Sequence, residues 1–197
     1  MAYVTSDITV SADGFGAGPN QALEHPLGEG GEQLHRWMFE TPDENAAEVA
    51  AITAADAFIM GRNMFGSGRG DWDPAWTGWW GDDPPYHKPV FVLTHHPRED
   101  VPMQGGTTFS FVTGGIHEAL KRAQDASGDG RIAVAGGPGT INQFLTAGLI
   151  DELRVHVAPV VLGGGERLFD RVPPGRLSQV SGRSASLVTH IVYRAVR

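Results

Sequence analysis

The sequence predicts an α/β fold in which a mixed, mostly parallel sheet is covered by helices. Short apolar runs, which are typical of buried strands, alternate along the chain with stretches whose apolar residues recur at three- and four-residue steps, as in amphipathic helices. Such alternation is typical of parallel sheets. Glycine-containing segments follow several of the strands. Because ligands bind beyond the carboxyl ends of parallel strands, we expect the functional site at that edge of the sheet.

The composition excludes several classes of protein. The 197 residues are 41% apolar, which suffices for one full core, and no segment has the composition of a linker, so we expect a single domain over residues 1–197. A net charge of -8 argues against a nucleic-acid partner. The absence of cysteine excludes disulfides and thiolate sites. The sequence begins without the features of a signal peptide and contains no apolar stretch near the ~20 residues of a membrane span, so we expect a cytoplasmic protein without a membrane partner.

Four strands and one helix are predicted in the first part of the chain. Residues 3–10 alternate between apolar and polar and stop at a turn signal in residues 12–14. Thr41 and Glu44 have the spacing of a capping box, with proline at the first helical position, and predict a helix that runs to about Ile52. Three apolar runs predict core strands at residues 57–60, 90–93 and 109–112.

The second part continues the alternation of helices and strands. An amphipathic helix from Ile116 to about Gly128 leads to the apolar run 132–135, and a second helix follows that run. A long strand over residues 153–162 then reaches three consecutive glycines. The last strand, about residues 187–196, follows only loop, so we expect it to pair antiparallel at an edge of the sheet.

The most informative motif is the glycine-rich segment after strand 132–135. Gly136, Gly137 and Gly139 leave the main chain open to a phosphate, and Pro138 fits the first turn of a helix, whose N-terminus adds about half a positive charge. The pattern is neither the spaced three-glycine Rossmann fingerprint nor a phosphate loop that ends in Gly-Lys-Ser/Thr. These glycines alone are compatible with a nucleotide site or with a plain strand-to-helix turn.

Basic and polar residues follow two other strands. Arg62 comes directly after strand 57–60, and Thr94, His95 and Arg98 come after strand 90–93. If the sheet is parallel, we expect these residues to converge around a second phosphate, separate from the one on the glycine loop. A nicotinamide dinucleotide with a 2′-phosphate requires two such sites. A solvated arginine and a surface turn at the histidines are the alternatives. None of the eight histidines has the spacing of a metal-ligand set, so we expect no metal.

Six segments resemble a known family when they are taken in order: residues 13–15, 57–65, 91–94, 135–140, 148–153 and 159–165. Through nearly the whole chain they are similar to the dihydrofolate-reductase-like family, which includes the reductase domain of the bifunctional deaminase-reductase of bacterial riboflavin biosynthesis. The resemblance implies a three-layer α/β/α fold with an antiparallel C-terminal edge strand, hydride transfer from NADPH, and a homodimer.

The same resemblance implies roles for single residues. Gly61 and Arg62 match the pair that holds the adenosine end of NADPH, and Thr94 and His95 match the turn beside its 2′-phosphate. Residues 13–15 would border the nicotinamide. The pyrophosphate loop, in which the family often has a cis bond between the first two glycines, corresponds to Gly136, Gly137, Pro138, Gly139 and Thr140.

The catalytic acid is not identified by the sequence. Dihydrofolate reductases carry a carboxylate on the first helix, but the matching segment, residues 33–39, has no acid in its opening turn. Glu32, just before this segment, Glu40, just after it, and Asp13 are the candidates, and solvated side chains are the alternative. The candidate substrate contacts are Phe15, Trp37, Trp76 and Gly164.

Four of the five tryptophans lie in residues 71–80. Asp73 and Pro74 have the types that begin a short helix, which would put Trp76, Trp79 and Trp80 on one face. This segment is interpreted either as a lid over a planar substrate or as a plug packed against the core or another subunit.

These observations predict an NADPH-dependent reductase of a small heterocyclic substrate, similar to a pterin or a ribosylaminopyrimidine. The type is that of dihydrofolate reductase or of 5-amino-6-(5-phosphoribosylamino)uracil reductase. The alternatives are a non-catalytic nucleotide-binding dimer and a structural dimer in which the glycine loops are only turns.

Overall fold

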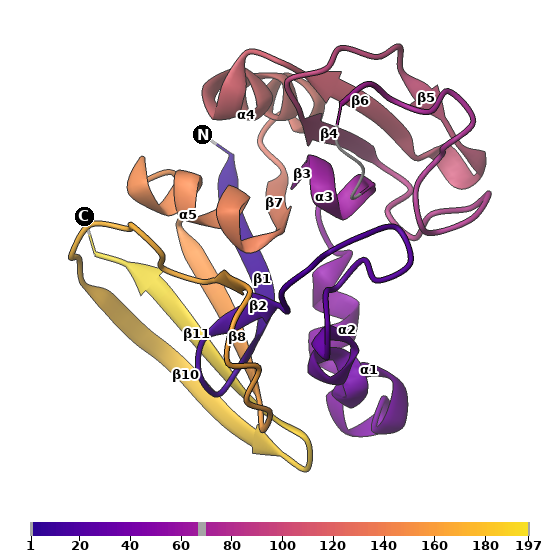
Figure 1. Cartoon of the computed structure of the whole chain (residues 1–197). Coiled ribbons are helices and arrows are strands. Elements are labelled where there is room, and N and C mark those ends of the chain that lie inside the picture. The colour runs from indigo at the N-terminus through magenta and orange to yellow at the C-terminus, as the bar shows by residue number, and fades with distance from the viewer. Residues whose placement is uncertain (1, 67–69, 197) are drawn as a thin grey trace.

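A nine-stranded sheet forms the centre of the computed structural model, which describes residues 2–66 and 70–196 (Figure 1). The strands of this sheet are β1 (Tyr3–Ser11), β3 (Ala57–Gly61), β4 (Pro89–Leu93), β5 (Val101–Pro102), β6 (Thr108–Val112), β7 (Arg131–Gly136), β8 (Glu152–Ala158), β10 (Leu177–Ala185) and β11 (Val188–Ala195). A separate two-stranded sheet pairs β2 (Phe15–Ala17) with β9 (Glu166–Arg167). The helical segments are η1 (Gly31–His35), α1 (Arg36–Glu40), η2 (Asp43–Asn45), α2 (Ala46–Ile52), α3 (Arg62–Phe65), η3 (Gln104–Gly106), α4 (Gly115–Ser127) and α5 (Pro138–Thr146).

The central sheet is parallel in its middle and antiparallel at both ends. Its strand order is β10-β11-β8-β1-β7-β3-β4-β6-β5. The six strands from β8 to β6 pair in parallel, whereas β11 pairs antiparallel with β8 and β10, and β5 pairs antiparallel with β6. The predicted mixed, mostly parallel sheet is therefore confirmed, as is the antiparallel pairing of the last strand.

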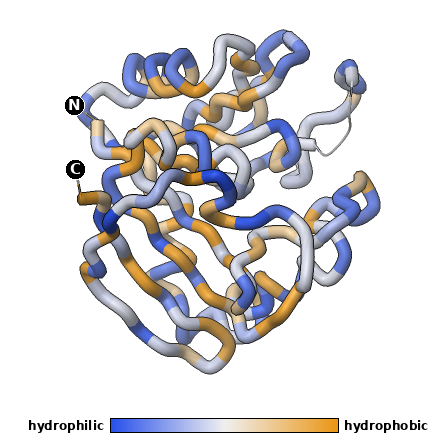
Figure 2. Tube along the Cα trace, turned by 60° about the vertical axis from the view of Figure 1, so that its left-hand side comes forward, coloured by the Kyte–Doolittle hydropathy of each residue, from blue (hydrophilic) through white to orange (hydrophobic). Residues whose placement is uncertain are grey.

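The two faces of β1 have different characters. Val4, Ile8 and Val10 belong to the apolar core cluster that includes Ile141 and Phe144 of α5. The alternate residues point to the opposite face of the sheet, because side chains alternate along a strand. Figure 2 shows this alternation of apolar and polar residues along the strands. The second face of β1 consequently carries polar side chains inside the molecule.

Two segments cover this second face. Trp37 of α1 is fully buried against β1, where its Nε1 donates to Thr9 Oγ1 at 3.2 Å. An aromatic cluster covers the same face of the sheet over β3, β4 and β6. Its buried members include Phe58, Phe65 and Phe109, and Trp72, Trp76 and Trp80 pack against them. With α4 and α5 on the other face, the sheet has helices or aromatic packing on both sides, as the three-layer prediction requires.

Most predicted strands agree with the structure to within a residue or two, but the C-terminal region differs. The strand expected at residues 153–162 ends at Ala158. The edge beside β11 is occupied by β10, which we did not predict. This strand is exposed at every position except Ala185, which is intermediate, and its two large apolar residues, Leu177 and Val180, do not alternate with polar ones. It therefore lacks the alternation that identifies a strand in sequence.

Two predicted helix starts are wrong. The capping box does not form, because Thr41 Oγ1 donates to Trp37 O and Glu44 Oε1 accepts from Ser186. A 3-10 turn, η2, precedes α2 instead. Residues 71–80 contain no helix, and Asp73 Oδ1 only caps a turn by accepting the N–H of Ala75 at 2.9 Å.

Candidate functional site

A cavity of about 980 Å³ lies along the carboxyl ends of the parallel strands. This volume is typical of sites for cofactors and small molecules. One group of lining residues comes from the glycine loop and from the turns after β3, β4 and β6, and we call it the loop end. A second group comes from β1, β2, the segment before η1, and η1 and α1, and we call it the strand end.

The glycine loop has the geometry of an anion site. The Gly136–Gly137 peptide bond is cis, as the resemblance implies, and Gly136 has φ 132°, a conformation that favours glycine. Gly137 precedes α5, which begins at Pro138. A Cβ on Gly137 would have no neighbour within 4 Å, so the main chain faces open space there. Free N–H groups and a helix dipole therefore meet at an accessible backbone.

Gly61 is required by close packing between the ends of β3 and α5. A Cβ at this position would lie 2.4 Å from Thr140 Oγ1, which is a severe overlap. Gly61 and Thr140 both line the cavity. The contact holds the turn after β3 directly against the glycine loop, as the predicted convergence of these segments requires.

Arg62 supplies a cation at the loop end. Its Cζ lies 3.9 Å from the centroid of the Trp72 ring, a cation–π contact that orients the guanidinium. Burial lowers the pKa of Arg62 from its usual value, and the negative charge of Asp71 acts in the opposite direction. Arginine keeps its charge in proteins in spite of such shifts, so this group remains a planar donor for phosphate oxygens.

The turn after β4 lies at the same end. Thr94 is buried, and its Oγ1 accepts the N–H of His96 at 3.1 Å, which fixes the turn. His96 Nδ1 lies 3.2 Å from Asp71 Oδ1. His95, an exposed residue, lines the cavity together with Thr94 and His96. The structure thus brings the cofactor-site residues predicted from three separate strands into one cavity, with the exception of Arg98.

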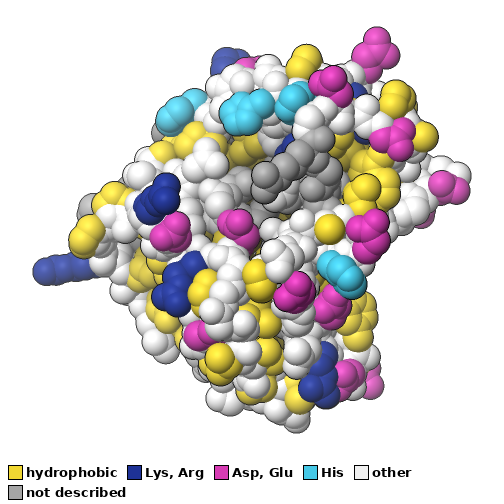
Figure 3. Space-filling model, viewed as in Figure 1, with side chains coloured by type: hydrophobic (Ala, Val, Ile, Leu, Met, Phe, Trp, Pro, Cys, Tyr) yellow, Lys and Arg dark blue, Asp and Glu magenta, His cyan; other side chains and the backbone are white. Residues whose placement is uncertain are grey.

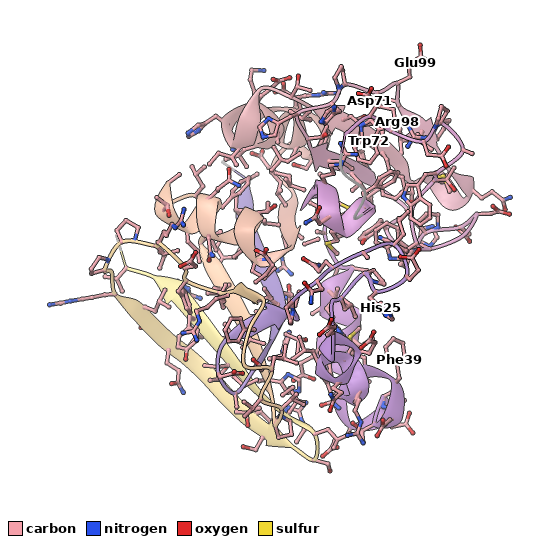
Figure 4. All side chains as sticks on the ribbon, in the orientation of Figure 1. His25, Phe39, Asp71, Trp72, Arg98 and Glu99 are labelled. Atoms are coloured by element: carbon pink, nitrogen blue, oxygen red, sulfur yellow. The ribbon has the colours of Figure 1, made fainter. Side chains whose placement is uncertain are left out.

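Arg98 lies outside the cavity lining, among the aromatic residues that support it. Its Nη2 donates to Pro74 O at 3.0 Å, and its guanidinium carbon is 5.3 Å from the centroid of the Phe111 ring. Figure 4 shows Arg98 beside Trp72 and Asp71, away from Phe39 at the strand end. We predicted a phosphate contact because Arg98 follows a strand, but the Thr94 turn directs the chain back over the cluster.

The candidate acids do not line the cavity. Glu32 is exposed on η1. Asp13 accepts the Ser11 hydroxyl at 2.6 Å and the backbone N–H groups of Leu162 and Gly163 at 3.1 and 2.8 Å. These hydrogen bonds, that of Ser11 foremost, lower the pKa of Asp13 to about 2. Asp13 is therefore ionised at neutral pH and anchors the segment after β8.

The four candidate substrate contacts also lie outside the lining of this cavity. Phe15 lies under the Arg167 guanidinium, 4.6 Å from ring centroid to Cζ, and lines a smaller neighbouring cavity. Trp37 is buried beneath the strand end. Trp76 donates its Nε1 to Phe65 O at 2.8 Å. Gly164 belongs to the loop that Asp13 anchors.

The tryptophan-rich segment is mainly a plug, and its edge reaches the cavity. Trp72 packs edge-on against Phe65, and Trp80 packs against Tyr86 and Phe109. Trp79 and Trp80 line the cavity, and Phe39, 79% exposed, lines it from α1. Planar apolar surfaces are thus available to a heterocycle at Trp79 and Trp80, two of the three tryptophans expected on one face of this segment, while Trp76 lies outside the lining.

Sequence reasoning missed a set of polar residues at the strand end. Asp7 on β1 and His35 on η1 line the cavity, and His156 of β8 lies behind Asp7, with Nε2 3.6 Å from Asp7 Oδ1. Burial, and next the proximity of His156, lower the pKa of His35. A charged residue in the middle of a strand predicted to be buried was the signal available in the sequence.

On the face seen in Figure 3, acidic side chains are interspersed with basic ones. Within the described ranges, no group of three or more acidic or histidine side chains is arranged to hold a metal ion. None of the helices described is both long and apolar enough to cross a membrane.

The family model for the RibD C-terminal domain matches residues 2–188. The chain belongs to the RibD C-terminal domain family. This result confirms the family resemblance of the motifs. A curated relative, the uncharacterized protein YyaP of Bacillus subtilis strain 168, is 28% identical over 193 residues, which cover 95% of this chain and 92% of YyaP.

Solved structures support the same assignment of the RibD C-terminal domain fold. A putative riboflavin biosynthesis protein from Shewanella sp. PV-4 is 27% identical with a TM-score of 0.68, and each chain covers 100% of the other. The deaminase/5-amino-6-(5-phosphoribosylamino)uracil reductase of Thermotoga maritima shares the fold at 14% identity and a TM-score of 0.62, over 99% of this chain and 57% of that one. Dihydrofolate reductase of Enterococcus faecalis, described in complex with NADP(H), shares it at 13% identity and a TM-score of 0.59, over 98% of this chain and 96% of that one. The dihydrofolate-reductase-like fold is therefore established, and the family supports an oxidoreductase.

Proposed function

We propose that this protein is an NADPH-dependent reductase of a small, planar heterocyclic substrate. The observation that carries the proposal is one cavity that joins an anion-binding glycine loop and a cation to a wall of aromatic and titratable side chains. Membership of the RibD C-terminal domain family and the fold shared with dihydrofolate reductase support it.

The loop end suits a dinucleotide with a 2′-phosphate. The backbone of Gly136, Gly137 and Gly139, at the start of α5, would hold the pyrophosphate. Arg62 and the Thr94 turn would hold the 2′-phosphate, for which a guanidinium fork is a favourable partner. When bound, the reduced nicotinamide supplies a hydride, and the protein supplies position and electrostatics.

The strand end and the two tryptophans of residues 71–80 that line the same cavity suit the substrate. Phe39, Trp79 and Trp80 offer flat apolar surface, and Asp7 and His35 offer hydrogen-bonding groups at the same cavity. A heterocycle of the pterin or ribosylaminopyrimidine type has both the planar ring and the polar edge that such a lining would recognise.

A titration with NADPH and with NADH tests the cofactor assignment. The expected result is quenching of tryptophan emission and energy transfer to the nicotinamide, with a clear preference for NADPH. Turnover with oxidised pterins and ribosylaminopyrimidines then separates a reductase from the alternative, a nucleotide-binding dimer without catalysis. Failure to bind either dinucleotide would overturn the proposal.

A further inference from the structure

Asp7 is a buried carboxylate in the cavity lining that the cofactor site does not use. Its side chain is only 8% exposed. Asp7 Oδ2 lies 3.5 Å from Arg154 Nη1, and Oδ1 lies 3.6 Å from His156 Nε2. Among the described residues, neither Asp7 Oδ1 nor His156 Nε2 has a hydrogen-bond partner. Two buried polar atoms thus face each other at a distance slightly too long for a hydrogen bond.

The hydrogen bonds behind His156 determine which ring nitrogens carry protons. Asn45 Nδ2 donates to Trp37 O at 3.2 Å and to Thr41 O at 2.9 Å, which orients its Oδ1 toward His190. His190 Nε2, 2.9 Å from that oxygen, must therefore be a donor. A neutral His190 then has a lone pair on Nδ1, so the 2.7 Å contact requires His156 Nδ1 to donate.

His190 is kept neutral by its surroundings. Burial, and next the proximity of His156, lower the pKa of His190 to about 4. Glu48, Glu44 and Arg183 also influence His190, and the Glu48 and Arg183 charges pair with each other at 2.8 Å. Trp37 packs on both histidine rings, with centroids 5.0 and 5.1 Å away, and both histidines are buried.

With Nδ1 of His156 engaged as a donor, its Nε2 is left to face Asp7 Oδ1 across the gap between β1 and β8. A proton that enters this gap can be bound by Asp7 Oδ1 or by His156 Nε2. Arg154, which also contacts Glu152 at 2.8 Å, carries a positive charge beside the pair, and His35, whose pKa is lowered by burial, is a further titratable group near it. The positions of Asp7 Oδ1 and His156 Nε2 therefore suit the binding and transfer of one proton at the cavity wall.

We infer that Asp7 is the catalytic acid of the reductase proposed above, and that His156 is the positioning residue that holds and replaces its proton. This inference rests on the proposed function. The substrate C=N carbon accepts a hydride, and the nicotinamide is thereby oxidised. The π electron pair moves to nitrogen, which takes the proton as the Asp7 O–H bond breaks, and a proton taken up from solvent, bound at His156 Nε2 or directly at the Asp7 carboxylate, then restores the acid.

Three variants separate this role from a structural one. Asp7→Asn keeps the size of the side chain but removes the acidic proton, His156→Gln removes the proton store, and His117→Gln alters an exposed histidine on α4 as a control. Asp7→Asn is expected to bind NADPH as the wild type does and to reduce substrate about 10²–10⁴-fold more slowly. His156→Gln is expected to shift the pH–rate profile, and His117→Gln to change neither quantity.

Nitrogen-15 NMR of the histidine rings tests the proton arrangement in the wild type without cofactor or turnover. The expected state is His190 protonated on Nε2 and His156 on Nδ1. The opposite tautomers, or full activity of Asp7→Asn, would overturn the inference and leave the proposed function intact. A wild type that binds NADPH but reduces none of the heterocycles would overturn the proposed function and, with it, the inference.

Discussion

The Arg62 guanidinium lies over the ring of Trp72, and Trp72 Nε1 in turn donates to His96 O at 2.8 Å. This indole therefore joins the turn after β3 to the turn after β4, the two segments that would share a 2′-phosphate. The cation is positioned by aromatic packing, and its orientation does not depend on a bound ligand.

Arg62→Ala is expected to weaken NADPH binding more than NADH binding. A hydrogen bond between a charged donor and a phosphate is worth about 1.5–3 kcal/mol, which corresponds to roughly a 10- to 150-fold rise in Kd for NADPH. Fluorescence titration of both dinucleotides measures the difference. Arg176→Ala, which removes an exposed arginine outside the cavity lining, is the control and should bind both as the wild type does. Equal losses for the two cofactors would contradict the role of Arg62.

Gly61→Ala is expected to destabilise the protein and to disturb the glycine loop. The new methyl group would overlap Thr140 Oγ1, and overpacking of this kind costs about 1–3 kcal/mol. Urea denaturation measures the loss. Gly139→Ala is the matched substitution, since its Cβ would meet only Glu166 Oε2 at 3.9 Å. It should retain stability but weaken dinucleotide binding, and equal stability of the two variants would refute the packing argument.

Stability is expected to fall as the pH is lowered from about 6.5 toward 4. The pKa of His190 is lowered to about 4 in the folded protein from its ordinary value of 6.5, so the unfolded chain binds more protons in that window. The full contribution is present above pH 6.5. His190→Gln should show a shallower decline of the unfolding free energy over this interval, while His117→Gln should follow the wild type. Parallel curves for all three proteins would show that His190 does not titrate as argued.

Asp13→Asn tests whether this residue is structural. Loss of the carboxylate weakens the hydrogen bonds to Ser11, Leu162 and Gly163. Thermal unfolding should therefore occur at a lower temperature, with no change in the shape of the pH–rate profile. Loss of the alkaline limb of the profile in Asp13→Asn would instead identify Asp13 as the catalytic acid, because activity falls along that limb as a catalytic acid loses its proton.

The loop end could be predicted from the sequence because each of its parts directly follows a strand. Parallel strands have their carboxyl ends at one edge of the sheet, so Gly61, Thr94 and Gly137 are expected at the same edge, and they converge because β7, β3 and β4 are neighbours. Arg98 shows the limit of this rule. Arg98 lies several positions beyond the last residue of β4, so a turn could redirect the chain before it. No pattern in the sequence predicts that turn.

The strand end could not be predicted in the same way. Asp7, His156 and His190 are brought together by the neighbouring positions of β1, β8 and β11 in the sheet, which depend on the strand order. The chain does contain polar residues at alternate positions of two buried strands. Without the order of the strands, that pattern predicts only a polar face of the sheet and not that Asp7 lies beside His156.

The position of β1 at the centre of the sheet has a consequence for how the chain folds. Its partners β7 and β8 are far away in sequence, and the contact between Ser6 and Val134 closes a separation of 128 positions. During synthesis the first strand emerges long before either neighbour exists, with its apolar side chains unsheltered. Because contacts of such long range slow folding, a chaperone or a nascent-chain interaction that shields residues 3–11 should raise the yield of active protein.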